Sequence, residues 1–212
     1  MKVLELFSGT HSIGKVAHSL GWEVVSVDRD LNGECPFNSG YISDYHIKED
    51  IMKWDYKKDF KKGEFDLITA SPVCLWWSIC RLSWIGRKIK SHGEKIITKE
   101  ILDNDIKKYG IPMVDKVFEI IEYFSPKYYW IENPQTGRMK EYIIDKPFYD
   151  VYYCMYGFEG KKKTRIWTNI EGFKPIICNH KKHYNQKEWN KGKLTRYRIP
   201  QKLIEELFLC II

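Results

Sequence analysis

The chain has 212 residues, of which 43% are hydrophobic and 30% charged, a composition typical of one folded domain and unlike that of a disordered chain. No apolar run approaches the roughly 18 residues that a membrane span needs. Glu5 interrupts the apolar segment near the N-terminus, so we expect no signal peptide. The 6 cysteines, in a chain of this length without a secretory signal, indicate reduced thiols. We therefore predict a soluble intracellular protein that is neither secreted nor bound to a membrane.

The formal net charge is +7, and it is unevenly distributed. Residues 1–135 hold 19 Lys and Arg against 20 Asp and Glu, whereas residues 136–212 hold 16 against 8. A basic second part with an aromatic-rich tract at 183–198 indicates a surface that follows a nucleic-acid backbone. The alternative is an ordinary solvated surface that is rich in lysine.

The first elements form one βαβ unit. Residues 2–7 are apolar and end at a Ser-Gly-Thr turn, which predicts a buried strand. Apolar residues at helical spacing follow over 13–20 and stop at Gly21, and a second apolar strand is expected at 23–27. A strand, helix and strand in so short a span predict a parallel sheet.

The same alternation continues along the chain. We expect a strand at 65–70, a helix at 114–121 and a strand at 127–131, then later strands at 151–155 and 164–169. Residues 79–111 are polar and irregular, and a loop of that length is typical of a lid or a binding arm. Pro200 begins a C-terminal helix.

Polar residues stand where the first strands end. Ser8, Gly9 and Thr10 form the turn after the first strand, where a glycine lets the backbone approach a ligand. Asp28 ends the second strand, about 20 residues past that turn, a place where an acid can bind ribose hydroxyls. Asp50 is a candidate for the end of the next strand. The alternative for both acids is a turn or a helix cap.

A cysteine and a glutamate end two neighbouring strands. Cys74 lies in Ser-Pro-Val-Cys after the strand at 65–70, and we expect a thiol beside a helix start to have a lowered pKa and to act as a nucleophile. Glu132 ends the strand at 127–131. A nucleophile and an acid/base group that face one cleft are the minimal set for covalent catalysis.

Four blocks in order resemble the cytosine-C5 DNA methyltransferases, most closely small phage and large-virus members: LELFSGTHSIG, ASPVCLWWS, WIENP and YGFEGKKKTRIW. The resemblance implies a class I, Rossmann-like methyltransferase sheet with helices on both faces that binds S-adenosylmethionine and releases S-adenosylhomocysteine. It implies a catalytic domain at 1–170 and a short basic extension with a terminal helix at 171–212. The site of action would be the host cytoplasm, the nucleus or a viral factory.

The resemblance also implies roles for single residues. Phe7 would pack on the adenine and Gly9 would lie against the methionine part, while Asp28 would bind the ribose and Asp50 the adenine. The implied cofactor site consists of Phe7, Ser8, Gly9, Thr10, Asp28, Arg29, Asp50, Ile51 and Pro72.

In catalysis, Cys74 would attack C6 of a cytosine flipped out of duplex DNA, and Glu132 would bind and protonate N3. Arg165 would steady the base and the glutamate. The implied substrate contacts are Ser78 to a DNA phosphate, and Arg81, Asn133 and Lys163.

The chain departs from the family pattern in two main ways. Val73 stands where the family has proline, and Trp76 and Trp77 replace smaller or polar residues. The segment after Asn169 is too short for the usual target-recognition domain, so we expect short or relaxed sequence specificity. Two alternatives stay open: a tRNA-type RNA cytosine-C5 methyltransferase, and a catalytically degenerate protein that only binds nucleic acid. Amino-methylation is disfavoured because the Pro-Pro-aromatic block of those enzymes is absent.

Cys178, His180 and His183 offer three zinc ligands, but no fourth ligand stands at the spacing that structural zinc sites have. We therefore predict no metal site. The other cysteines are interpreted as small buried hydrophobic residues: Cys80, Cys154 and Cys210.

Overall fold

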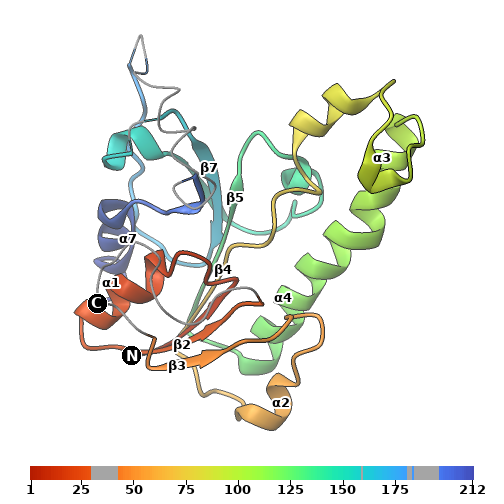
Figure 1. Cartoon of the computed structure of the whole chain (residues 1–212). Helices are drawn as coiled ribbons and strands as arrows, with labels where there is room; N and C mark the ends of the chain where they lie inside the picture. The colour runs from red at the N-terminus through yellow and green to blue at the C-terminus, as the bar shows by residue number, and fades with distance from the viewer. Residues whose placement is uncertain (30–42, 159, 181–182, 184–195) are drawn as a thin grey trace.

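A computed structural model describes residues 1–29, 43–158, 160–180, 183 and 196–212. Its centre is a seven-stranded sheet in the order β3-β2-β1-β4-β5-β7-β6, in which β7 runs antiparallel to both neighbours and the other adjacent pairs are parallel (Figure 1). The strands are β1 (Lys2–Leu6), β2 (Glu23–Val27), β3 (Tyr45–Ile47), β4 (Leu67–Ala70), β5 (Tyr128–Pro134), β6 (Phe148–Tyr152) and β7 (Lys163–Thr168). The helices are α1 (Ser12–Ser19), α2 (Tyr56–Asp59), α3 (Lys99–Asp105), α4 (Ile111–Phe124) and α7 (Gln201–Phe208).

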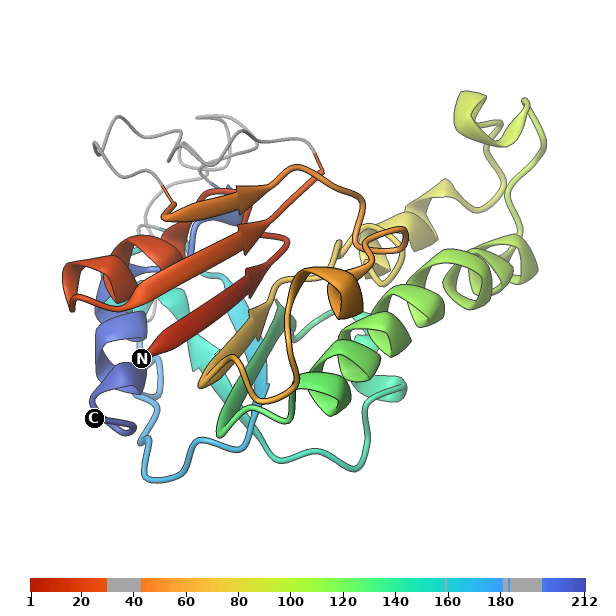
Figure 2. The ribbon, with the colours of Figure 1, turned by 90° about the horizontal axis from the view of Figure 1, so that it is seen from below.

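Helices cover both faces of the sheet, as predicted (Figure 2). Side chains alternate along β1, so Val3 packs with α1 and α7 on one face while Leu4 packs with α4 on the other. Val16 of α1 and Val117 of α4 are fully or almost fully buried in these two layers. Among the described residues, no helix is both long and apolar enough to cross a membrane.

The predicted elements that recur in the structure lie within three residues of their expected bounds. The largest displacement of a strand concerns the one expected at 151–155. β6 ends at Tyr152, and a 3-10 turn, Tyr153–Tyr156, follows it. This shift matters because it puts Tyr153 at the end of a strand.

The prediction of an irregular loop at 79–111 is wrong for the second half of that segment. α3, a π-helical turn (Ile106–Gly110) and α4 follow one another without a break, and they form the long helix that crosses Figure 2. Gly110 lies in the segment expected to be irregular, and a Cβ on this residue would lie 3.0 Å from the Trp77 ring. The glycine therefore permits close packing inside the helix, and the π-helical turn accommodates the missing N–H of Pro112.

The first half of that segment has a buried polar centre. Arg81, which is 3% exposed, forms an ion pair with Asp105 of α3, and its guanidinium lies 5.2 Å from the ring centroids of both Trp76 and Trp84. His92 Nε2 lies 2.9 Å from the same Asp105 carboxylate. These contacts fold residues 79–92 against the end of the long helix (Figure 1).

The terminal helix, expected in an extension after residue 170, packs on the sheet. Leu203, Ile204 and Leu207 of α7 are fully buried in the same core as α1, and Phe208 packs on Trp22 with ring centroids 4.7 Å apart. α7 thus shares one hydrophobic core with α1 and β1. Sequence periodicity predicts such a helix but not the face on which it packs.

Candidate active site

The candidate site lies where the order of strands reverses. β1 stands between β2 and β4, and the chain runs outward to one side through β2 and β3 and to the other through β4 and β5. In open α/β sheets, ligands bind outside the carboxyl ends of the strands at such a point. Nearly all the predicted site residues follow these strand ends.

A buried carboxylate shapes the first turn. Glu5 of β1 is 4% exposed, and its Oε1 accepts hydrogen bonds from the backbone N–H groups of Ile13 and Gly14 at 3.2 and 3.1 Å. Its Oε2 accepts one from the Ser26 hydroxyl at 3.3 Å. A negative charge on these N–H groups stabilises the start of α1. Glu5 thereby fixes the turn against both β1 and β2.

The turn itself contacts Asp28. The Gly9 N–H donates a 3.0 Å hydrogen bond to the Asp28 carboxylate, which joins the ends of β1 and β2. Phe7 and Gly9 both have positive φ, 55° and 46°. For phenylalanine this backbone is strained, and such strain is found at ligand sites. Ser8 and Thr10, also in the turn, are buried.

Asp50 lies three residues past the end of β3. Its carboxylate accepts a 3.0 Å hydrogen bond from the Met52 N–H, so it also caps a turn. Ile51 beside it is buried, and Arg29, just after Asp28, is exposed. The sheet thus brings Asp28 and Asp50 to neighbouring strand ends, as the sequence predicts.

The loop after β4 carries Cys74 and is tied to β5. Asn133, 1% exposed, donates a 2.8 Å hydrogen bond from Nδ2 to the carbonyl of the buried Pro72. Asn133 was expected to contact substrate, but this bond gives it a positioning role. Beyond Cys74, Trp76 stacks on Tyr109 with ring centroids 4.6 Å apart. Trp77 packs against the long helix, so both tryptophans hold the loop.

The pKa of the Cys74 thiol is raised, and the expected lowering is wrong. Burial is the main cause, and the negative charge of Glu132 adds to it. The positive charges of Lys162 and Arg196 act in the opposite direction. The resting cysteine is therefore a thiol whose ionisation depends on the charge of its neighbours.

Glu132 is held by two residues that flank the strands beyond it, Tyr153 directly after β6 and Lys162 directly before β7. Its Oε1 accepts a 2.8 Å hydrogen bond from the Tyr153 hydroxyl and lies 3.5 Å from Lys162 Nζ. Burial and the Glu132 charge raise the pKa of Tyr153 well above its ordinary value, so the phenol remains a donor. Lys162 Nζ also lies 4.6 Å from the centroid of the Tyr153 ring and donates to the Arg196 carbonyl at 3.3 Å.

Arg165 does not contact Glu132. In the sheet register, Glu132 is opposite Ile166 and Asn133 is opposite Arg165, so the side chains of Glu132 and Arg165 leave opposite faces. Arg165 instead forms an ion pair with Asp150 at 2.7 Å, and Lys163 Nζ lies 3.7 Å from the same carboxylate. Lys162 occupies the place beside the glutamate that was expected for Arg165.

Two other expected substrate contacts have partners within the protein. The Ser78 hydroxyl accepts a 3.2 Å hydrogen bond from the Cys80 N–H and caps the turn Ile79–Trp84. Arg81 is buried on Asp105, as described above. Arg81 therefore stabilises the fold of the segment after the loop that carries Cys74, and the partly buried Ser78 begins that segment.

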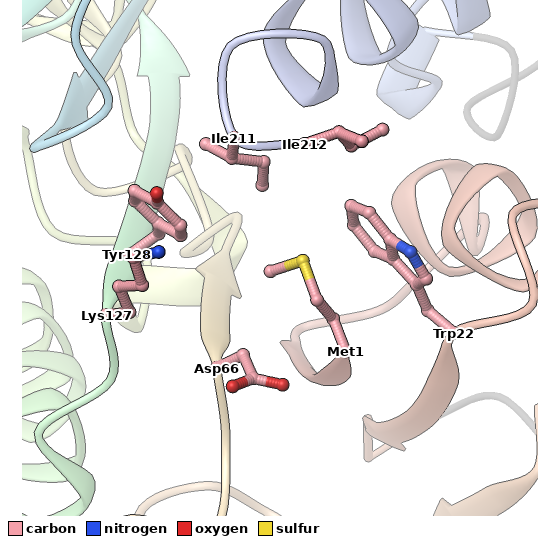
Figure 3. A pocket seen from close by; sticks show the side chains of 7 residues that line it. All are labelled: Met1, Trp22, Asp66, Lys127, Tyr128, Ile211 and Ile212. Carbon is pink, nitrogen blue, oxygen red and sulfur yellow. The ribbon is translucent and has the colours of Figure 1, made fainter.

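Two hollows of about 300 Å³ border the sheet. One adjoins the first turn and is lined by residues that include Thr10, Ser12, Tyr156, Phe158 and Ile199. The other lies beside the amino ends of β1, β4 and β5 (Figure 3) and is lined by Met1, Trp22, Asp66, Lys127, Tyr128, Ile211 and Ile212. This second hollow holds none of the predicted site residues.

A viral protein resembles the chain along its whole length. The chain is 39% identical over 234 aligned residues to the "Probable DNA (cytosine-5)-methyltransferase" of Frog virus 3 (isolate Goorha), and the match covers 99% of this chain and 100% of that protein. The chain belongs to the DNA (cytosine-5)-methyltransferase family. No protein-family model matches it.

A solved structure with a TM-score above 0.5 supports the fold of this methyltransferase. The Entamoeba histolytica methyltransferase EhMeth matches with a TM-score of 0.52 at 16% identity, over 86% of this chain and 57% of that chain. A Spodoptera frugiperda DNMT2 mutant matches with a TM-score of 0.46 at 17% identity, over 82% and 53%. The chain thus spans less than two thirds of either protein. The predicted Rossmann-like methyltransferase fold is confirmed.

The sequence analysis of this methyltransferase missed three residues of the site. Glu5 was considered only as an acid in an apolar segment, although an acid inside a buried strand is itself a signal of a built polar contact. Tyr153 and Lys162 gave no comparable signal. Both contact Glu132 because of strand pairing at long range.

Proposed function

We propose that the chain transfers a methyl group from S-adenosylmethionine to C5 of cytosine in DNA, with Cys74 as the nucleophile. One observation carries this proposal: Cys74 and Glu132 meet at the ends of β4 and β5, close enough for the glutamate charge to raise the thiol pKa. The name of the Frog virus 3 relative supports cytosine C5 in DNA as the acceptor.

The first turn suits the proposed methyl donor. Asp28 offers a carboxylate at the end of β2 for vicinal hydroxyls, and its bond to Gly9 fixes it beside the turn. Phe7 offers an aromatic face, and Asp50 and Ile51 stand at the next strand end. S-adenosylmethionine supplies an electrophilic methyl group and leaves as S-adenosylhomocysteine.

Proton transfer follows from the Cys74–Glu132 pair. We propose that Glu132 takes the thiol proton and passes it to N3 of a flipped cytosine while the sulfur bonds to C6. C5 becomes nucleophilic and accepts the methyl group. Loss of the C5 proton to solvent then expels Cys74 as a thiolate. N3 returns its proton to Glu132, which passes it back to the sulfur. Lys162 stabilises the charge that moves between sulfur and carboxylate.

Once Glu132 carries the proton, its repulsion of a Cys74 thiolate disappears. The raised pKa keeps Cys74 as an unreactive thiol in the resting protein. Binding of the substrate base then allows the thiol to lose its proton. This arrangement explains why a thiol that is weakly acidic at rest serves as a nucleophile.

The test is covalent trapping on duplex DNA that contains 5-fluorocytosine, in the presence of S-adenosylmethionine. Fluorine at C5 blocks the final proton loss, so we expect a denaturant-resistant adduct. Cys74→Ala should abolish the adduct and keep cofactor affinity within a few-fold. Cys80→Ala, which changes an exposed cysteine in the same segment, should leave the adduct unchanged.

The other outcomes separate the alternatives. An adduct with fluorinated RNA and none with DNA would replace the proposed substrate. Cofactor and nucleic-acid binding without any adduct would identify a non-catalytic protein, with Val73 in place of proline as the first residue to restore.

A further inference from the structure

Four potential metal ligands meet at the edge of the sheet beyond the active site. Cys154 lies in the turn after β6, and Cys178, His180 and His183 follow β7. One ligand atom from each of the four lies within 4.8 Å of all the others. We propose that these residues bind a structural Zn²⁺ ion. The prediction of no metal site rested on the lack of a fourth ligand nearby in sequence, and Cys154 supplies it from 24 residues before Cys178.

The distances match a tetrahedral zinc centre. The two sulfurs are 3.5 Å apart, and His183 Nε2 lies 3.4 Å from the Cys154 sulfur and 3.1 Å from the Cys178 sulfur. His180 Nδ1 lies 3.7 Å from the Cys178 sulfur. Zn–S bonds near 2.3 Å and Zn–N bonds near 2.1 Å place tetrahedral ligand atoms about 3.3–3.8 Å apart. Three of these four separations fall in that range, the fourth is 0.2 Å shorter, and all four ligand atoms lie within 4.8 Å of one another.

The protein holds the ligands in place by other contacts. Cys154 sits in the turn that begins with the buried Tyr153. The segment before Cys178 is fixed by a 3.1 Å hydrogen bond from the Ile176 N–H to the Tyr156 hydroxyl. The two imidazole rings lie edge to face, with centroids 5.5 Å apart, so that they converge on the sulfurs without stacking.

The ligand chemistry selects the metal. Two thiolates and two neutral imidazoles are soft and borderline ligands in tetrahedral array, which suits Zn²⁺ and disfavours Mg²⁺ and Ca²⁺. Binding releases the two thiol protons, so Zn²⁺ with two thiolates adds no net charge to this basic part of the chain. Four protein ligands leave no open position, as in structural zinc sites.

The ion would connect the turn that carries Tyr153 to the chain segment after β7. Tyr153 donates a hydrogen bond to Glu132, so the zinc site would stabilise the position of this glutamate without contacting the reacting atoms. We expect zinc to raise the stability of the methyltransferase whether or not DNA and cofactor are bound.

The experiment measures metal content of the untagged full chain, after incubation with Zn²⁺ and removal of excess ion. We expect about one zinc per chain in the wild type and in Cys80→Ser. Cys178→Ser and His180→Ala should lose it. His180 is exposed, so its variant separates loss of metal from loss of fold. Co²⁺ in place of Zn²⁺ should give the visible absorption of a tetrahedral thiolate site.

Two results would overturn the inference. One is a wild-type chain that takes up no zinc although all its thiols are reduced. The other is a disulfide between Cys154 and Cys178, detected by thiol titration under denaturing conditions. Neither result decides whether the chain transfers methyl groups. Failure of the trapping assay, in turn, would not change the metal content.

Discussion

The Tyr153 hydroxyl donates a 2.8 Å hydrogen bond to Oε1 of Glu132 across the strand that separates them. β5 and β6 both lie beside β7. The glutamate lies two residues before the end of β5, and the tyrosine directly follows β6. Both side chains are buried. The tyrosine therefore orients the carboxylate that faces Cys74, and it acts through Glu132 as a positioning residue.

Tyr153→Phe should lower kcat/KM for DNA by about 10- to 100-fold, since a hydrogen bond to a charged group contributes about 1.5–3 kcal/mol. Steady-state methylation measures the loss of activity, and urea unfolding in parallel measures any loss of stability. Tyr149→Phe is the matched control because it removes a 3.1 Å hydrogen bond to the Ile170 carbonyl, away from the site. Equal losses of activity in the two variants would contradict a specific role for Tyr153.

Glu132→Gln should abolish methylation and yet make Cys74 more reactive. The glutamate charge raises the pKa of the Cys74 thiol, so its removal lowers that pKa and increases the thiolate fraction near neutral pH. The rate of iodoacetamide alkylation against pH, followed by peptide mass spectrometry, measures the shift. The alkylation of Cys80 in the same samples is the internal control. A pKa that stays constant or rises would refute electrostatic coupling between the two residues.

Lys162→Met should shift the Cys74 pKa in the opposite direction, upward, because the lysine charge favours the thiolate. Alkylation at a fixed pH should slow, and Lys162→Arg should restore part of the rate. The adjacent Lys163→Met is the control, since Lys163 lies beside Asp150 on the other side of the strand. The role assigned to Lys162 is wrong if the Lys163 variant slows the alkylation of Cys74 as much as the Lys162 variant does.

Glu5→Ala should reduce the free energy of unfolding by about 3 kcal/mol or more, because it leaves two helix N–H groups and the Ser26 hydroxyl without their carboxylate. Glu5→Gln keeps an acceptor oxygen, so its free energy of unfolding should fall by less. Because Glu5 fixes the turn with Gly9, both variants should also bind S-adenosylmethionine more weakly, which calorimetry measures. Ser26→Ala removes one of the three bonds to Glu5 together with the 2.9 Å bond that the Ser26 hydroxyl accepts from the Ser43 hydroxyl, so its free energy of unfolding should fall by less, about 1–2 kcal/mol. Equal stability of Glu5→Ala and Ser26→Ala would contradict the capping role.

The sequence alone determined the βαβ pattern, the four ordered blocks and the strand ends that carry Gly9, Asp28, Cys74 and Glu132. These features are local, since apolar periodicity predicts strands and helices, and the carboxyl ends of parallel strands share one edge. Residues that follow neighbouring parallel strands therefore lie at the same edge of the sheet, however the helices pack on its faces.

Only the tertiary structure decided which side chains pair across the sheet. The pairing of β7 with β6 puts Arg165 opposite Asp150, and its pairing with β5 brings Lys162 to Glu132. A shift of one residue would turn each side chain to the other face of the sheet. The helix through Gly110 was not predicted for a similar reason, because the close contact of this glycine with Trp77 joins segments far apart in the chain. Cys154 could not be linked to Cys178 from spacing, because a whole strand separates the two cysteines. Long-range strand register leaves no periodic signal in a single sequence, and it governs the contacts of Glu132 and the proposed zinc site alike.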